Sequence, residues 1–90
     1  MKSVEITVKG RVQGVFFRAN VTAKANELGL KGYAKNLDDG DVEIVAQGTE
    51  EQIDELIKFI QNNPGHSEVE EINVKDYKYN IKWNGFVISY

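Results

Sequence analysis

The apolar residues of this chain alternate between the spacing of a strand and the spacing of a helix, and the order of these patterns restricts the fold. Near the N-terminus apolar and polar residues alternate strictly, which indicates a half-buried strand. A loop over residues 10–17 follows, and a helical period then predicts a helix over about residues 18–28. The apolar positions behind these predictions are Val4, Ile6 and Val8 in the strand and Val21, Ala25 and Leu28 in the helix.

The middle of the chain predicts a hairpin and a second helix. Residues 31–37 and 41–47 are expected to form two strands around an Asp-Asp-Gly turn. Thr49 and Gln52 have the spacing of a capping box, in which each side chain bonds to the backbone of the other residue. The helix that they begin is expected to end before Asn62. Its apolar stripe consists of Ile53, Leu56, Ile57 and Ile60.

The C-terminal part of the chain predicts two further strands. Two phases of alternation meet near Asp76, so the fourth strand is expected to bulge or break there. The first phase comprises Ile72 and Val74, and the second comprises Tyr77, Tyr79, Ile81 and Trp83. An Asn-Gly turn at residues 84–85 then leads into a last strand over residues 86–90.

This order of elements, β-α-β-β-α-β plus a short C-terminal strand, is that of an α+β ferredoxin-like fold. In such a split β-α-β sandwich, two helices cover one face of an antiparallel sheet. The first two strands run parallel with the third between them, so their carboxyl ends lie two strand spacings apart, roughly 10 Å. Asn36 is therefore expected to face the loop of residues 10–17 across a gap the size of a small molecule.

Length, composition and charge predict one small soluble domain over residues 1–90. The chain is 41% hydrophobic and 28% charged, as in ordinary soluble proteins, and it has no cysteine. It shows neither an apolar run near the ~20 residues of a membrane span nor a signal peptide, so a cytoplasmic location without a membrane partner is expected. The net charge of −3 argues against nucleic-acid binding. We also expect a monomer.

Residues 10–18, with the sequence GRVQGVFFR, place a flexible turn directly before an arginine at a helix start. Gly10 and Gly14 permit conformations that point several N–H groups to one side, and the positive end of the helix faces the same point. Arg18 adds a permanent charge, which is unfavourable at a helix N-terminus unless an anion lies between them. The segment therefore predicts a phosphate site. The residues expected to anchor this loop in the core are Val12, Val15, Phe16 and Phe17.

A second segment, residues 32–48, follows after one helix length, and the two segments together resemble the acylphosphatase family. The first segment matches that family's G-x-V-Q-G-V-x-x-R loop in full. The resemblance extends to residues 28–32 and 86–90, and it so covers nearly the whole chain. The second segment matches the family's G-aromatic-small-K-N-x-x-x-G-x-V pattern through Gly32, Tyr33, Lys35, Asn36, Gly40 and Val42.

The resemblance implies an enzyme that hydrolyses small acyl phosphates to a carboxylate and inorganic phosphate, with no metal or other cofactor. Its catalytic residues would be Arg18, which holds the phosphoryl group, and Asn36, which orients the attacking water. The implied phosphate-binding residues, acting chiefly through backbone N–H groups, are Gln13, Gly14, Val15, Phe16, Phe17 and Arg18. Val21, Tyr33 and Ala34 depart from the commonest family pattern, which affects local packing and the hydrogen bonds around the site and leaves the catalytic pair unchanged.

Two other classes of function stay open. A noncatalytic module that binds phosphate or acyl phosphate would keep the loop without needing an asparagine to position water. A nucleic-acid-binding module is suggested by residues 31–34, which match the first half of an RNA-binding motif, but the second half lacks the aromatic residues that stack bases. Asp38, Asp39 and Asp41 lack the spacing of a calcium loop, and His66 is expected to be a surface residue.

The direction of the last strand leads to a prediction about the C-terminus. This strand is expected to run parallel to the first strand and to finish at the same sheet edge as the phosphate loop. We therefore predict that the α-carboxylate of Tyr90 lies within reach of Arg18 and fixes the orientation of its guanidinium.

Overall fold

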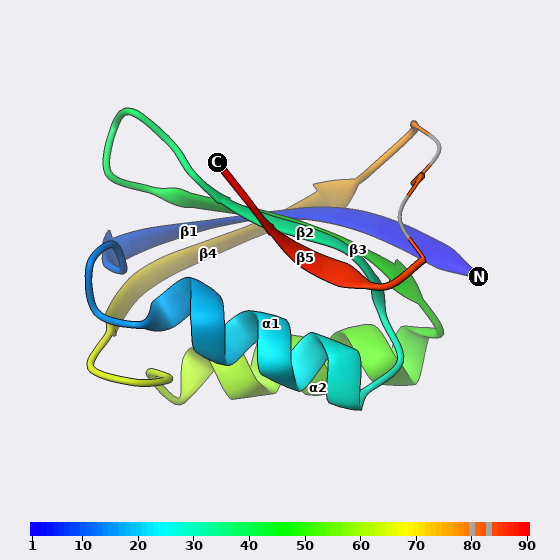
Figure 1. The fold of residues 1–90 in the computed structure, drawn as a ribbon, viewed down its shortest axis with the longest axis horizontal. Coiled ribbons are helices and arrows are strands. Elements are labelled where there is room, and N and C mark those ends of the chain that lie inside the picture. The colour runs from blue at the N-terminus through cyan, green and yellow to red at the C-terminus, as the bar shows by residue number, and fades with distance from the viewer. Residues whose placement is uncertain (80, 83) are drawn as a thin grey trace.

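The computed structural model describes residues 1–79, 81–82 and 84–90. These residues form two helices on one face of a five-stranded sheet (Figure 1). None of the helices among them is long and apolar enough to cross a membrane. Along the chain the elements are β1 (Lys2–Arg11), α1 (Phe17–Glu27), β2 (Lys31–Asn36), β3 (Val42–Gly48), α2 (Glu50–Gln61), β4 (Glu68–Asp76) and β5 (Phe86–Ser89).

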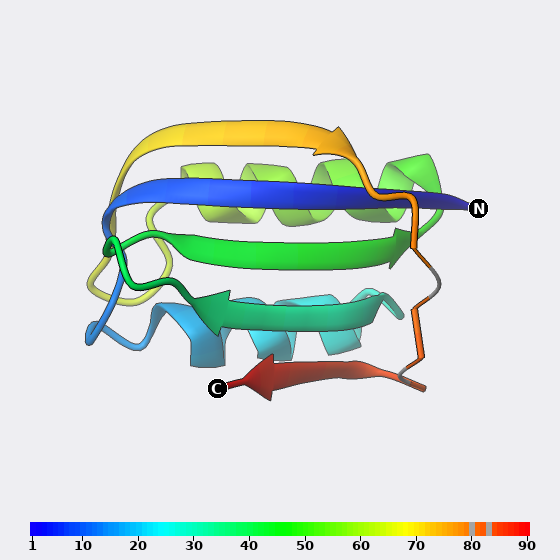
Figure 2. The same ribbon diagram turned by 90° about the horizontal axis from the view of Figure 1, so that it is seen from above.

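The strands lie in the order β4-β1-β3-β2-β5 (Figure 2). β1 pairs antiparallel with β3 and β4, and β2 pairs antiparallel with β3, which confirms the predicted ferredoxin-like arrangement. β5 pairs parallel with β2, so the sheet is mixed and not wholly antiparallel as expected. The cause is the direction of β5. It runs parallel to β1, as predicted, and the sheet edge that it joins belongs to β2, which runs the same way.

One apolar core lies between the helices and the sheet face beneath them. α2 begins after Thr49 with the predicted capping box, and it ends at Gln61 as expected. Its stripe buries Ile53, Leu56 and Ile60, each of which stabilises the fold by about 1.5–3 kcal/mol. The opposing residues of α1 are Phe17, Val21 and Ala25.

The predicted break of the fourth strand is confirmed, because β4 ends at Asp76. Trp83, which belongs to the second phase of alternation, lies outside the described residues. A second irregularity was not predicted: the register between β1 and β4 shifts between Lys9 and Gly10. A bulge of this kind bends the strand that carries it, and here it falls just before β1 leads into the glycine-containing loop.

Three strands that run in the same direction finish at the same end of the sheet, where their carboxyl ends lie. β1, β2 and β5 all end there, as Figure 2 shows at the side where the chain also terminates. This end of the sheet therefore collects the loop between β1 and α1, Asn36 at the end of β2, and Ser89 at the end of β5. Segments far apart in the sequence meet there.

Candidate active site

Two left-handed residues and one backbone hydrogen bond determine the conformation of the loop between β1 and α1. Gly14 and Phe16 both have left-handed backbone conformations, with φ of 71° and 64°. The carbonyl of Val15 accepts a hydrogen bond from the His66 N–H at 3.3 Å. Because the C=O and N–H of a trans peptide point in opposite directions, this bond directs the Phe16 N–H away from His66. Such a concave backbone segment binds anions.

The N-terminus of α1 continues this set of donors. Phe16 is the N-cap residue, and its side chain makes no capping hydrogen bond. Its carbonyl accepts both the backbone N–H of Asn20 at 3.1 Å and the side-chain Nδ2 of Asn20 at 2.8 Å. The next N–H, that of Phe17, therefore points outward from the start of the helix. No acidic residue lies in the first turn, so the positive end of the helix is not neutralised there.

Arg18 lies in this first turn and is held by the end of β5. Its Nη1 donates to the carbonyl of Ser89 at 3.0 Å, and its guanidinium carbon lies 5.1 Å from the centre of the Tyr90 ring. No ion pair among the described residues includes Arg18. The predicted contact with the Tyr90 carboxylate is therefore wrong, because a backbone carbonyl and an aromatic ring take its place. Arg18 keeps its charge available for an anion.

Asn36 reaches the same space from the opposite side. It is the last residue of β2 and pairs with Val42 of β3. Its side-chain Oδ1 is buried and, among the described residues, has no hydrogen-bond partner. A buried acceptor without a partner costs about 1–3 kcal/mol, so this oxygen is free to accept a hydrogen bond from a molecule that enters the space.

A cavity of about 290 Å³ lies where these groups meet. Arg18, the helix start and Asn36 contribute its polar groups, and apolar side chains form much of the remaining wall. The structure so brings together both predicted catalytic residues and four of the six predicted phosphate-binding residues. The residues that line the cavity are Val12, Gly14, Phe16, Phe17, Arg18, Ala19, Asn36 and Ile88.

Two predicted phosphate-binding residues, Gln13 and Val15, do not line the cavity. Val15 is buried, and its carbonyl is bonded to the loop that carries His66. The side chain of Gln13 points to the turn after β2, where its Nε2 donates to two backbone carbonyls. Sequence reasoning missed the roles of this side chain and of the His66 N–H, because neither contact leaves a local pattern.

The prediction that Phe16 anchors the loop in the core is also wrong. Its side chain is 70% exposed, whereas Val12, Val15 and Phe17 are buried as predicted. The left-handed conformation at Phe16 turns its ring outward, to 6.4 Å from the ring of His66. His66 is itself exposed, as expected for a surface residue.

The three departures from the family pattern lie outside the cavity. Val21 and Ala34 are fully buried in the core. Tyr33 donates its hydroxyl to Glu43 Oε2 at 2.8 Å. Burial raises the pKa of Tyr33 and the Glu43 carboxylate raises it further, so the hydroxyl stays protonated and acts as a donor. These positions agree with the prediction that the departures affect local packing and hydrogen bonds and not the catalytic pair.

The carboxylates near the β2–β3 turn bind protein groups. Asp39 Oδ1 accepts the Asp41 N–H at 3.0 Å, and Asp41 Oδ2 accepts a hydrogen bond from Lys9 Nζ at 2.7 Å. This bond and the charge of Asp41 raise the pKa of Lys9. Within the described part of the chain, no three His, Cys, Asp or Glu residues gather as metal ligands would.

Comparisons with known proteins agree with this geometry. The sequence model of the acylphosphatase family matches residues 4–88. An acylphosphatase of Dehalococcoides mccartyi is 41% identical over the full length of both chains, and one of Methylococcus capsulatus is 40% identical over 98% of this chain and 96% of its own. The crystal structure of acylphosphatase from Bacillus subtilis superposes with a TM-score of 0.93 at 38% identity and covers all of both chains. The chain therefore belongs to the acylphosphatase family, whose enzymes hydrolyse acyl phosphates to a carboxylate and inorganic phosphate.

Proposed function

We propose that this acylphosphatase cleaves its substrate by direct, in-line attack of water on the phosphorus atom. The observation that carries this proposal is the single cavity into which Arg18, the start of α1 and Asn36 all face. In the reaction the water oxygen forms a bond to phosphorus as the bond between phosphorus and the acyl oxygen breaks. The carboxylate leaves with the electron pair of that bond.

The phosphoryl group is held by the donors on one side of the cavity. The backbone N–H groups of the loop and of the first turn of α1, from Gln13 to Arg18, bind its equatorial oxygens together with the Arg18 guanidinium. The carbonyl contacts of Val15 and Phe16 support this assignment for the N–H groups of Phe16 and Phe17. Donors fixed before the reaction stabilise the charge that spreads over these oxygens in the transition state.

Asn36 positions the water from the other side. Its unpartnered Oδ1 supports this role, because the oxygen can accept a hydrogen bond from a water that lies between Asn36 and the phosphoryl group. An amide is too weak a base to remove the proton. The proton therefore passes to an oxygen of the phosphoryl group, which becomes part of the inorganic phosphate product.

We further propose that one domain over residues 1–90 acts as a monomer in the cytoplasm, without a metal ion. A carboxylate is a good leaving group, so the bond breaks without Lewis-acid assistance. Two carboxylates of the β2–β3 turn, those of Asp41 and Asp39, already bind Lys9 and the Asp41 N–H. The acyl phosphate is the partner, and neither a membrane nor a nucleic acid takes part.

Benzoyl phosphate tests the proposal, since its hydrolysis changes its absorbance. We expect turnover by the purified protein in excess EDTA, and we expect Asn36→Ala to lower kcat by about 10² while the inhibition constant Ki of inorganic phosphate changes less than twofold. Phosphate binding without turnover would favour the noncatalytic module instead. A metal requirement restored by Mg²⁺ would contradict the metal-free mechanism, and equal losses in kcat and in phosphate affinity would show that Asn36 binds the phosphoryl group.

A further inference from the structure

The side chain of Gln13 connects the two halves of the active site. We propose that Gln13 is a positioning residue for Asn36, because its carboxamide fixes the turn after β2 relative to the phosphate-binding loop. This inference rests on the proposed role of Asn36 in orienting water. It assigns Gln13 a task for its side chain that differs from the backbone contact with phosphate predicted for it.

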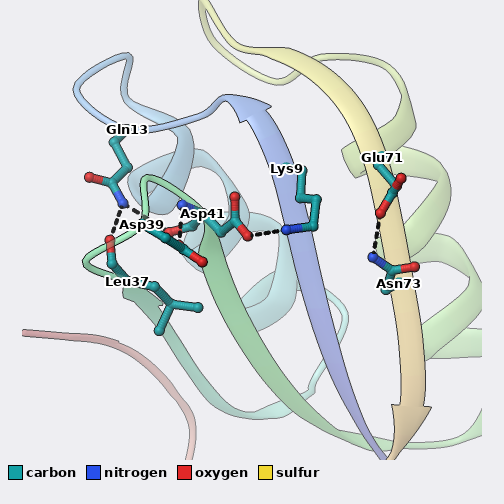
Figure 3. A network of polar contacts seen from close by, with 7 residues as sticks. All are labelled: Lys9, Gln13, Leu37, Asp39, Asp41, Glu71 and Asn73. Atoms are coloured by element: carbon teal, nitrogen blue, oxygen red, sulfur yellow. Dashed lines mark hydrogen bonds and ion pairs between the residues drawn. The ribbon is translucent and has the colours of Figure 1, made fainter.

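The contacts of Gln13 use both N–H groups of its carboxamide. Nε2 donates to the carbonyl of Leu37 at 2.8 Å and to the carbonyl of Asp41 at 2.9 Å, as Figure 3 shows for the loop and the turn. Leu37 directly follows Asn36, and Asp41 directly precedes Val42, the β3 residue paired with Asn36. The two bonds therefore hold the chain on both sides of the Asn36–Val42 pair, one residue away from each member.

The turn has other bonds to described residues, but they lie within it or lead to β1, and none leads to the phosphate-binding loop. Its carbonyls also accept bonds within the turn, from the Gly40 N–H to Leu37 at 3.2 Å and from the Leu37 N–H to Asp41 at 2.8 Å. The Lys9–Asp41 ion pair ties it to β1. Among the hydrogen bonds between described residues, those of Gln13 alone join residues 12–16 to residues 37–41. Without them the turn keeps its shape but loses its direct bonds to the loop.

A loss of this kind affects the attack of water more than the binding of phosphate. A change of the Gln13 side chain leaves every backbone N–H of residues 13–18 in the chain, and Gln13 does not line the cavity. Asn36 must hold water in line with the bond that breaks, and a misplacement of about 1 Å costs as much as 10² in rate. We therefore expect removal of the Gln13 carboxamide to lower kcat and to leave phosphate affinity nearly unchanged.

The test combines Gln13→Met with Asn36→Ala in a double-mutant cycle. Methionine keeps the length of the side chain and removes both donors. We expect Gln13→Met to lower the kcat for benzoyl phosphate about tenfold, with the Ki of inorganic phosphate within twofold of the native value. In the Asn36→Ala background we expect no further fall in kcat, since a positioning residue has no effect once the residue it positions is gone.

Gln52→Met is the matched control. Gln52 also bridges two elements, since its Nε2 donates to the Leu28 carbonyl at 2.7 Å, but it lies at the opposite end of the sheet from Asn36. This variant should lose stability in urea unfolding and keep the native kcat. If Gln13→Met is unfolded at the assay temperature, Gln13→Asn replaces it, because its carboxamide is one methylene too short to reach both carbonyls.

Two results would overturn the inference. One is a native kcat in folded Gln13→Met. The other is an equal fall in kcat in both backgrounds together with a raised phosphate Ki, which would place the action of Gln13 in the loop itself. The single variant Asn36→Ala reports separately on the proposed function: if it keeps the native kcat, the role of Asn36 is wrong, whatever Gln13→Met does.

Discussion

The two helices of this protein begin in opposite ways. At α2, Thr49 has an extended conformation and forms a capping box with Gln52, and Glu50 and Glu51 add negative charge to the first turn. At α1, the N-cap residue Phe16 has a left-handed conformation without a side-chain cap, and the first turn has no acidic residue. The positive N-terminus of α2 is neutralised by its own side chains. The N-terminus of α1 stays positive, and its N–H donors stay open.

If α1 binds phosphate as proposed, this difference marks where stability is given up for binding. A side-chain cap is worth about 1 kcal/mol, and a left-handed conformation costs a residue other than glycine roughly 1–2 kcal/mol. α1 has no side-chain cap, and its N-cap residue Phe16 is left-handed. Arg18 adds a positive charge to the positive end of the helix. An arrangement that is unfavourable for a helix alone becomes favourable when a phosphoryl group lies between the helix and the guanidinium.

The largest expected effect is the loss of the positive charge at α1. Arg18→Gln should lower kcat/KM for benzoyl phosphate by at least ~10²–10³, the scale found when one preorganised donor is removed from a developing negative charge. The fold should persist, since Arg18 does not belong to the buried stripe of α1. The control is Lys24→Gln, which removes a cation from the last turn of the same helix. Near-native turnover by a folded Arg18→Gln protein would show that the open N-terminus is not the active site.

A smaller effect should follow when the first turn of α1 is given an acidic residue like those in the first turn of α2. Ala19 is exposed, lies in the first turn of α1 and lines the cavity. In Ala19→Glu a carboxylate would occupy the anion site, and we expect the Ki of inorganic phosphate to rise about tenfold, since like charges at this range repel by about 1 kcal/mol or more. Ala19→Gln controls for size. Equal phosphate affinity of the Glu and Gln variants would contradict an electrostatic role for this helix end.

At α2 the same reasoning predicts a change in stability without a change in activity. Thr49→Ala removes the acceptor for the Gln52 N–H, a bond of 3.1 Å. The free energy of unfolding, measured by urea titration, should fall by about 1 kcal/mol, and kcat and KM for benzoyl phosphate should stay at native values. A kinetic defect in this variant would mean that the two helix termini are coupled and that their comparison does not separate stability from function.

Much of the fold can be predicted from the spacing of apolar residues. The parts that could not be predicted have physical causes. The alternation in β1 and the stripe of α2 place these elements because each buries one face. The partner of β5 could not be predicted, since four residues carry too little pattern to choose between the two edges of the sheet. Its parallel pairing with β2 depends on its direction, which the turn before it determines.

The site likewise has parts that a local sequence pattern predicts and parts that it does not. Arg18 and Asn36 belong to local motifs and were predicted, and both line the cavity. The contacts of Gln13 with Leu37 and Asp41 join residues at least 24 positions apart, so no local sequence pattern indicates them. Phe16 was misplaced because a large apolar side chain usually packs inward, and here the backbone conformation at the helix start overrides that preference.

The smallest expected effect on the site follows from a change at Gly65. This residue directly precedes His66, whose N–H bonds to the loop before α1. Gly65 has φ of +66°, and a Cβ there would lie 2.9 Å from the Val15 carbonyl oxygen and 3.0 Å from Asn20 Nδ2. Gly65→Ala must therefore push on the phosphate-binding loop. Gly29 has φ of +80° after the far end of α1, and a Cβ there would meet only the flexible side chain of Gln52 at 3.4 Å.

Both alanine variants carry the same kind of backbone strain, which should cost each about 1 kcal/mol of unfolding free energy, and Gly65→Ala should lose more because of its contact with the Val15 carbonyl oxygen. Only Gly65→Ala should also raise the Ki of inorganic phosphate, by about threefold, because it displaces the peptide whose N–H faces the ligand. Inhibition assays with benzoyl phosphate, combined with urea unfolding of both proteins, separate the shared strain from the local displacement. If the two variants change phosphate affinity equally, the contact between the His66 loop and Val15 does not help to hold the donors of α1 in place.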